Sequence, residues 1–176
     1  MADKVRVMIT EEQVNLRVKE LAEQISKDYE GKSIHLICIL KGSVFFSCDL
    51  AKRLTIPVTF DFMSVSSYGN ETVSSGRVRI LKDLDESIQG RDVLIVEDII
   101  DSGRTLAYLK DMLGGRAPAS LEICTLLDKP DRREVEVDVK YVGFEIPDEF
   151  VVGFGLDYNQ YYRNLPYVGA VELGED

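Results

Sequence analysis

Short, nearly continuous apolar runs alternate with helical patterns along this chain of 176 residues, and this alternation constrains the fold more than any other feature. The apolar runs predict strands at residues 34–40, 58–65, 93–96 and 121–127, and an alternating stretch predicts another at 77–81. Apolar residues at helical spacing predict helices at 10–31, 44–54 and 102–113, the first opened by a capping box of Thr10 and Gln13. Strands that are apolar throughout are typical of parallel sheets covered on both faces. The sequence therefore predicts an α/β fold with a mostly parallel sheet flanked by helices.

Ligand-binding loops are expected beyond the carboxyl ends of the predicted strands, after Leu40, Val96 and Leu127. A polar stretch rich in Ser and Gly at 66–76 predicts a long mobile loop. From Tyr141 onward the chain is richer in aromatic residues and shows no long helical pattern, which predicts a smaller irregular lobe. Without an internal repeat or a linker, we expect one domain over 1–176.

The formal net charge of -10 argues against a general binder of nucleic acid or of anionic membranes, because such proteins recruit their partners through excess Lys and Arg. Three cysteines without CxxC spacing, each in an apolar stretch, predict reduced buried thiols. The first residues lack the apolar core of a signal peptide, and no later apolar run is long enough to span a bilayer. We therefore expect a cytoplasmic protein.

The segment 93–106, VLIVEDIIDSGRTL, is the strongest functional signal. An apolar strand ends in Glu97 and Asp98, and Asp101 to Thr105 then lead into a helix. Hydroxyl groups and free backbone N–H groups at a helix N-terminus form a seat for phosphate, and a glycine such as Gly103 permits close approach. The alternative is a capped strand-to-helix turn without a ligand. The spacing of a P-loop and the complete GxGxxG pattern are both missing from the sequence.

This segment resembles the phosphoribosyl diphosphate motif of the phosphoribosyltransferases, and an Asp at position 101 resembles the enzymes that act on 6-oxopurines. Further segments resemble hypoxanthine phosphoribosyltransferases, especially bacterial ones, along nearly the whole chain; they are 40–42, Ser67 with Tyr68, 127–130, 147–153 and 157–163. The resemblance implies a type I phosphoribosyltransferase fold, with a twisted core of about 30–127 and a small hood from about 128–176 and part of the N-terminus. It also implies purine salvage, in which phosphoribosyl diphosphate and hypoxanthine or guanine give IMP or GMP and pyrophosphate.

The resemblance implies that residues 97–105 bind the ribose and its 5′-phosphate and supply the general base. Asp101 is the implied general base, which takes the proton from purine N7 as N9 attacks. Ser102, Gly103, Arg104 and Thr105 are implied to hold the 5′-phosphate with Asp101. Glu97 and Asp98 are implied to bind the ribose hydroxyls and Mg²⁺, since hard carboxylate oxygens suit that ion.

The remaining implied roles belong to pyrophosphate, the purine and a lid. Lys41, Gly42 and Arg163 would hold pyrophosphate, and Asp157 would hold Mg²⁺ on that side and border the purine. Lys129 would donate to the 6-oxo group, Phe150 would stack on the base, and the Val151 backbone would read its edge. Ser67 and Tyr68 would close over the reacting centre. Each role has a plainer alternative. Lys41 would be a solvated lysine, Asp157 a turn residue and Arg163 a surface residue, and Phe150 and Val151 would belong to the core. We interpret His35 as structural.

Two alternatives stay open. A xanthine-guanine phosphoribosyltransferase also carries Asp in the phosphate loop, although the C-terminal pattern favours hypoxanthine. A regulator that senses phosphoribosyl diphosphate and binds nucleic acid would keep the same fold, but the basic cluster of Lys129, Arg132 and Arg133 is small and lies among acidic residues. We expect neither a nucleic-acid nor a membrane partner. The resemblance implies a homodimer or homotetramer.

Overall fold

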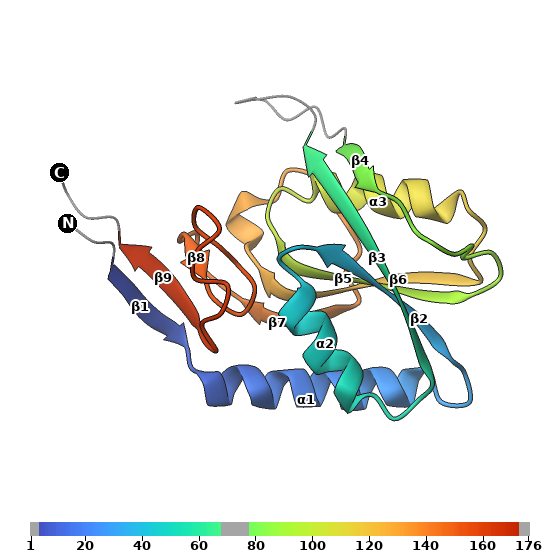
Figure 1. Cartoon of the computed structure of the whole chain (residues 1–176), viewed down its shortest axis with the longest axis horizontal. Helices are drawn as coiled ribbons and strands as arrows, with labels where there is room; N and C mark the ends of the chain where they lie inside the picture. Colours follow the sequence, from blue (N-terminus) through green and yellow to red (C-terminus); the bar gives the residue numbers. More distant parts are fainter. Residues whose placement is uncertain (1–3, 68–77, 173–176) are drawn as a thin grey trace.

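The computed structural model of the chain, which describes residues 4–67 and 78–172, is built around a six-stranded sheet (Figure 1). The strand order is β4-β3-β2-β5-β6-β7, and every neighbouring pair is parallel except β3 and β4. The strands are β2 (Ile34–Leu40), β3 (Val58–Ser67), β4 (Val78–Lys82), β5 (Asp92–Ile100), β6 (Ser120–Asp128) and β7 (Tyr141–Glu145). The prediction of a mostly parallel sheet is confirmed.

Three helices cover the two faces of this sheet (Figure 1). They are α1 (Glu11–Asp28), α2 (Val44–Arg53) and α3 (Arg104–Gly114). Leu36 and Cys38 of β2 pack into the cluster that contains α1 and α2, whereas Ile37 and Ile39 pack into the cluster that contains α3. Successive side chains of a strand point to opposite faces, so an uninterrupted apolar run serves both clusters.

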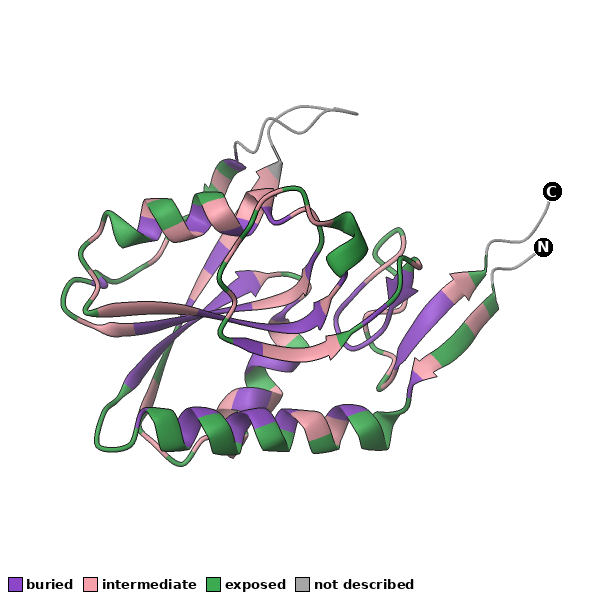
Figure 2. Ribbon diagram, turned by 180° about the vertical axis from the view of Figure 1, so that it is seen from behind, coloured by how far each residue is buried: buried purple, intermediate pink, exposed green. Residues whose placement is uncertain are grey.

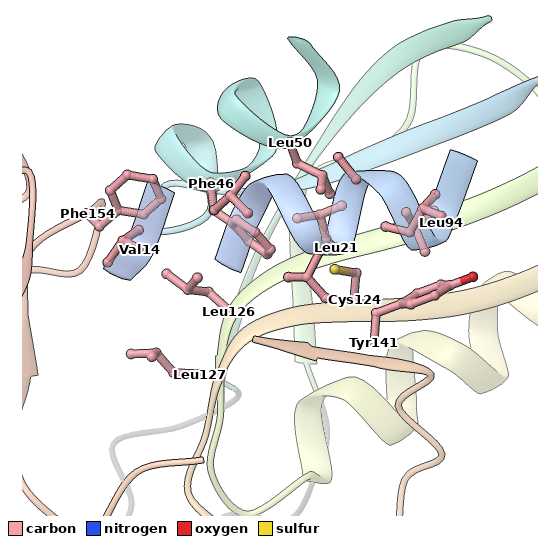
Figure 3. Packing of buried hydrophobic residues seen from close by; sticks show 14 of the residues in the cluster. Val14, Leu21, Phe46, Leu50, Leu94, Cys124, Leu126, Leu127, Tyr141 and Phe154 are labelled. Carbon is pink, nitrogen blue, oxygen red and sulfur yellow. The ribbon is translucent and has the colours of Figure 1, made fainter. Parts of the chain in front are cut away.

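The larger cluster lies between the sheet and the helices α1 and α2 (Figure 3). Leu21 of α1 and Phe46 of α2 are fully buried there, as is Cys124 of β6. Buried and exposed residues alternate along α1 as expected for a helix with one face on the core (Figure 2). The predicted capping box opens α1, because Thr10 Oγ1 accepts from the Gln13 N–H and the Gln13 side chain accepts from the Thr10 N–H.

A second, antiparallel sheet joins the two ends of the chain (Figure 1). It consists of β1 (Lys4–Ile9), β9 (Val168–Glu172) and the short β8 (Val151–Val152), in the order β1-β9-β8. The irregular turns that follow β8 lie next to the start of α2. A 3-10 helix, η1 (Pro130–Arg132), follows β6. The small sheet therefore places the C-terminal segment beside the end of β2.

The element bounds differ from the sequence-based ones where polar residues take part in regular structure. β5 continues through Glu97 and Asp98 to Ile100, so its loop begins after Ile100 and not after Val96. α3 begins at Arg104 and not at Ser102. β3 extends through Ser67, so the predicted loop at 66–76 overlaps its last two residues, and the rest of that loop lies outside the described residues.

The cysteines are all free, as predicted, and Cys38 and Cys124 are buried. The expectation of burial is wrong for Cys48, which is exposed on α2. Within the described ranges, no helix is long and apolar enough to cross a membrane.

Candidate active site

A cavity of about 340 Å³ lies at the carboxyl end of β5. Its walls are formed by the end of the strand, the following loop and the first turn of α3, namely Glu97, Asp98, Ile99, Ile100, Asp101, Ser102, Gly103, Thr105 and Leu106. A larger hollow of about 910 Å³ lies at the opposite end of the sheet, between the end of α1 and the segments before β2 and β3. Because parallel sheets bind ligands at the carboxyl ends of their strands, the cavity at β5 is the candidate site.

The loop before α3 has a backbone that requires glycine. Gly103 is the N-cap of α3 and adopts φ 83°, and a Cβ there would overlap the carbonyl oxygen of Val135. Ser102 Oγ accepts a hydrogen bond from the Arg104 N–H at 3.2 Å. The N-cap residue is Gly103, which has no side chain to cap the helix, so Asp101 is not the cap of α3. The first turn of α3 borders the cavity, and the N-terminus of a helix favours an anion there.

The segment after η1 fixes this loop from the outside. The N–H groups of Glu134 and Val135 both donate to the Ser102 carbonyl oxygen, at 2.9 and 3.0 Å. The Arg104 guanidinium donates to the Glu134 carboxylate at 2.5 Å. The predicted phosphate-binding arginine is thus held at the rim of the loop by an acidic partner.

Arg133 links the loop to the end of β6. Its Nε donates to the Asp101 carbonyl oxygen at 3.1 Å, and its guanidinium also pairs with the Asp128 carboxylate. Lys129, which follows Asp128 at the end of β6, donates its backbone N–H to the Ile100 carbonyl oxygen at 3.0 Å. The ends of β5 and β6 are therefore tied together beside the cavity.

Asp101 and Lys129 form an acceptor and a donor that lie side by side. The Lys129 Nζ is 3.9 Å from the Asp101 Oδ1. The Lys129 side chain is only 11% exposed, whereas the Asp101 side chain is 54% exposed. A ligand at this point meets a mostly buried ammonium group and an accessible carboxylate at the same time.

Glu97 and Asp98 place two carboxylates at the base of the cavity. The Glu97 Oε1 accepts from the Asp98 N–H at 3.1 Å, and the Asp98 Oδ1 accepts from the Ile99 N–H at 2.7 Å. Burial raises the pKa of Glu97 well above its usual range, and the neighbouring Asp98 carboxylate raises it further. Burial also raises the pKa of Asp98, although its hydrogen bonds with the Glu97 side chain and the Ile99 N–H oppose the shift.

The Lys41–Gly42 loop lies directly against this acidic pair. The peptide bond between Leu40 and Lys41 is cis. A Cβ on Gly42 would overlap the Asp98 carboxylate, and a Cβ on Gly155 would overlap the Gly42 carbonyl oxygen. Two glycines thus allow three segments that are far apart in sequence to meet.

Arg163 is held against the same place by the turn that follows β8. The Gly155 N–H donates to the Arg163 carbonyl oxygen at 2.9 Å, and the Arg163 guanidinium donates to the Gly155 carbonyl oxygen at 2.6 Å. The Asp157 Oδ1 is 3.4 Å from the Arg163 guanidinium, and the Asp157 Oδ2 accepts from the Gln160 N–H at 2.8 Å. The predicted pyrophosphate residues Lys41, Gly42 and Arg163 therefore gather beside Asp98.

Phe150, the residue predicted to stack on the purine, directly precedes β8, and Val151, whose backbone is predicted to read the edge of the base, begins β8. Phe150 is 53% exposed and packs edge-on against Tyr158, with 5.6 Å between the ring centroids. Its exposure rules out ordinary core packing for this ring. Val151 is buried and pairs with Ala170. Ser67 ends β3, and Tyr68 lies outside the described residues.

The donor set at Glu97 and Asp98 fits a magnesium ion that is shared with a ligand. Within residues 4–67 and 78–172, no group of three or more His, Cys, Asp or Glu side chains converges as a metal site. Mg²⁺ is typically bound by one or two carboxylates together with substrate oxygens and water, so two adjacent carboxylates are sufficient. Asp157 fits less directly, since each of its oxygens already has a partner in its own turn.

Sequence reasoning missed the residues that fix the predicted ones. Arg133 and Asp128 link the phosphate loop to β6, and Gln160 contacts both Lys41 and Arg163. The sequence indicates Arg133 only as part of a small basic cluster. A local signal for these contacts is absent from the sequence, because the partners lie far apart along the chain.

Comparison with known proteins agrees with this geometry. The model of the phosphoribosyl transferase domain matches residues 8–159. The hypoxanthine-guanine phosphoribosyltransferase of Streptococcus thermophilus is 52% identical over 167 residues, which cover 95% of this chain and 93% of the relative. The hypoxanthine phosphoribosyltransferase of Salmonella typhimurium is 55% identical over 175 residues, which cover 98% of each protein.

The solved structures agree as well. The crystal structure of a hypoxanthine-guanine phosphoribosyltransferase from Bacillus anthracis, with a HEPES molecule in its active site, matches with a TM-score of 0.93 and 51% identity. The match covers 96% of this chain and 100% of that one. The predicted fold class is thereby confirmed.

Proposed function

We propose a purine-salvage function for this chain, which belongs to the phosphoribosyltransferase family. It is an enzyme that transfers the 5-phosphoribosyl group of phosphoribosyl diphosphate to hypoxanthine and guanine, giving IMP or GMP and pyrophosphate. The observation that carries the choice of base is the donor and acceptor pair of Lys129 and Asp101, which lie 3.9 Å apart. A free 6-oxopurine that carries its proton on N7 presents the O6 acceptor and the N7–H donor side by side, which matches the Lys129 donor and the Asp101 acceptor.

The base is recognised by this pair. The Lys129 ammonium donates to the 6-oxo oxygen. A 6-amino group would place a donor against a buried donor, and a site built for one hydrogen bond strongly rejects the analogue that cannot form it. Phe150 stacks on the base from the small sheet, and the Val151 backbone and Asp157 border it; the exposed ring of Phe150 supports this role.

Asp101 is the general base in this proposal. Its accessible carboxylate takes the N7 proton while N9 attacks C1 of the sugar and pyrophosphate leaves. Positioned proton transfer of this kind contributes roughly 10² to 10⁴ in rate. Arg133 holds the Asp101 backbone in place through the carbonyl oxygen. The carboxylate therefore needs little rearrangement before reaction.

The 5′-phosphate is held by the loop from Asp101 to Thr105. The N-terminus of α3 supplies backbone N–H groups and about half a positive charge. Gly103 lets the backbone approach, and the hydroxyl groups of Ser102 and Thr105 supply further donors. Arg104 contributes from the rim.

The ribose and pyrophosphate lie on the other side of the base. Glu97 and Asp98 accept hydrogen bonds from the ribose hydroxyls and hold Mg²⁺, which neutralises charge on the diphosphate when it is bound. Lys41, the Gly42 backbone and Arg163 hold the pyrophosphate oxygens, and Asp157 is a further candidate ligand on that side. Ser67 and Tyr68 are proposed to form part of a lid.

The wider setting is also proposed. We infer a single domain over 1–176 that works in the cytoplasm, and the exposed free thiol of Cys48 supports a reducing compartment. We propose a homodimer or homotetramer, as the family resemblance implies. Neither a nucleic acid nor a membrane is proposed as a partner.

The test is pyrophosphate release from phosphoribosyl diphosphate and Mg²⁺ with hypoxanthine, guanine, xanthine, adenine and uracil in turn. We expect hypoxanthine and guanine to react, with adenine and uracil slower by at least about 10²-fold. Preference for adenine would overturn the assignment to 6-oxopurines. Equal rates with xanthine and guanine and little with hypoxanthine would favour the xanthine-guanine alternative. Nucleic-acid binding without turnover would favour the regulator.

A further inference from the structure

The turn from Asp157 to Arg163 has an unusual backbone for a segment without glycine. Asn159, Gln160 and Tyr162 all adopt positive φ angles, of 50°, 70° and 75°. L-residues rarely adopt this left-handed conformation, and it costs free energy at each position. Tyr158 and Tyr161 close the turn with two backbone hydrogen bonds, of 3.0 and 2.9 Å. Strain that is retained in this way points to a role for the side chains that the turn directs.

Gln160 is the exposed residue of this turn whose side chain contacts both Lys41 and Arg163. The Asp157 Oδ2 accepts from the Gln160 N–H at 2.8 Å, which fixes the backbone of Gln160. The Gln160 Oε1 accepts from the Arg163 guanidinium at 3.0 Å and lies 3.4 Å from the Lys41 Nζ. One neutral oxygen therefore sits between two cations from distant parts of the chain.

The chemistry of an amide suits this position. The amide oxygen accepts hydrogen bonds from both cations without cancelling their charge, whereas a carboxylate would form ion pairs with both. Lys41 and Arg163 are also the two side chains proposed to bind pyrophosphate. An oxygen that accepts from both occupies the place of a pyrophosphate oxygen.

We propose that Gln160 is a positioning residue of the pyrophosphate subsite, which holds Lys41 and Arg163 around one oxygen-sized position and gives way to an oxygen of the diphosphate group. This inference rests on the proposed function, since it assigns that subsite to the diphosphate of the substrate. The side chains are ordered before the ligand arrives, so less conformational freedom is lost when it binds. Gln160 itself takes no part in breaking the bond at C1.

The experiment compares Gln160→Glu with Gln160→Met and with the control Asn159→Asp. The first puts a carboxylate between the two cations, and the second removes the acceptor at nearly constant size. Asn159 is exposed and precedes Gln160, so its substitution adds the same charge one residue away. Asp tolerates the left-handed conformation, as Asn does. Initial rates are measured at about 0.15 M salt, which screens charges beyond about 8 Å.

We expect Gln160→Glu to raise the KM for phosphoribosyl diphosphate by about tenfold or more. The new carboxylate would pair with Lys41 and Arg163 and so compete with the diphosphate for these two cations. Gln160→Met should raise the same KM about three- to tenfold, because the Lys41 and Arg163 side chains would no longer be ordered before the ligand binds. The KM for hypoxanthine should stay within about twofold of the wild type in both. Asn159→Asp should leave both KM values within about twofold, because in the described part of the chain the hydrogen bonds to Lys41 and Arg163 come from Gln160 and not from Asn159. Thermal unfolding of each variant is measured to check that it is folded.

Direct binding of inorganic pyrophosphate with Mg²⁺, measured by calorimetry, gives a readout that does not need turnover. We expect the same order, with wild type and Asn159→Asp binding more tightly than Gln160→Met, and Gln160→Glu binding weakest. If the wild type turns over hypoxanthine but all four proteins share one KM and one pyrophosphate affinity, the role of Gln160 is refuted and the proposed function stands. If the wild type turns over no base, the proposed function fails, and equal pyrophosphate affinities would refute the Gln160 inference separately.

Discussion

Substitution of Gly42 by Ala tests whether the contact between the Lys41–Gly42 loop and Asp98 is needed for catalysis. A Cβ at this position would overlap the Oδ2 and Cγ atoms of Asp98. Such an overlap is relieved only if the carboxylate or the loop moves by on the order of 1 Å, and a misplacement of that size costs about 10²-fold in rate. We therefore expect kcat/KM for phosphoribosyl diphosphate to fall about 10²-fold, which corresponds to about 2.7 kcal/mol of transition-state stabilisation. Overpacking should also lower the free energy of unfolding by about 1–3 kcal/mol.

The matched control is Gly114→Ala at the end of α3. A Cβ there meets no atom within 4 Å, so the substitution should leave activity unchanged. It should raise the free energy of unfolding by about 0.4–1 kcal/mol, because alanine restricts the unfolded chain. Steady-state rates of nucleotide formation and urea unfolding are measured on both variants. A folded Gly42→Ala variant with wild-type kcat/KM would refute the reasoning, as would an equal loss of activity in Gly114→Ala.

Three further perturbations follow from single contacts. Asp101→Asn should lose roughly two to four decades of kcat while binding substrates normally, and wild-type turnover would contradict its role as the base. Arg133→Met should lower the free energy of unfolding by about 1–3 kcal/mol in urea and also lower kcat, because it leaves the Asp128 carboxylate unpaired and releases the Asp101 backbone; an unchanged kcat would argue against positioning. Burial raises the pKa of Tyr29 from 10.0 to about 12, so the stabilisation is complete below pH 10 and is lost as the pH rises to about 12. The free energy of unfolding should fall over that interval, and Tyr29→Phe should remove this part of the fall.

Local patterns predicted the fold well where side chains repeat with the period of the element. The capping box at Thr10 and the apolar run at 34–40 mark α1 and β2 closely. Prediction failed where the backbone hydrogen bonds of an element continue beyond its apolar side-chain pattern. The apolar run at β5 stops before Glu97, but the backbone ladder continues until Ile100 pairs with Asp128, since a ladder does not need apolar side chains.

The ends of α3 and the exposure of Cys48 show a similar limit. Ser102 resembles a helix cap by composition, whereas the positive φ of Gly103 decides where α3 begins. Cys48 lies in an apolar stretch, but helical geometry turns it to the exposed side of α2.

The candidate site was predictable in part, because its motif residues lie together along the chain. Glu97 to Thr105 are contiguous and reach one cavity. The contacts of Arg133 with Asp101 and of Gln160 with Lys41 join residues 32 and 119 positions apart. Such contacts depend on how β6 and the turn after β8 are placed in three dimensions, and no periodicity reports that placement.

The most direct test of the central claim is the stoichiometry of the reaction with hypoxanthine. The protein is incubated with hypoxanthine, phosphoribosyl diphosphate and Mg²⁺, and IMP and pyrophosphate are measured by chromatography and phosphate assay. We expect equal amounts of IMP and pyrophosphate to form as hypoxanthine is consumed, and a chelator of divalent cations to stop the reaction. A folded protein that forms no IMP, or that releases pyrophosphate without nucleotide, would contradict the claim.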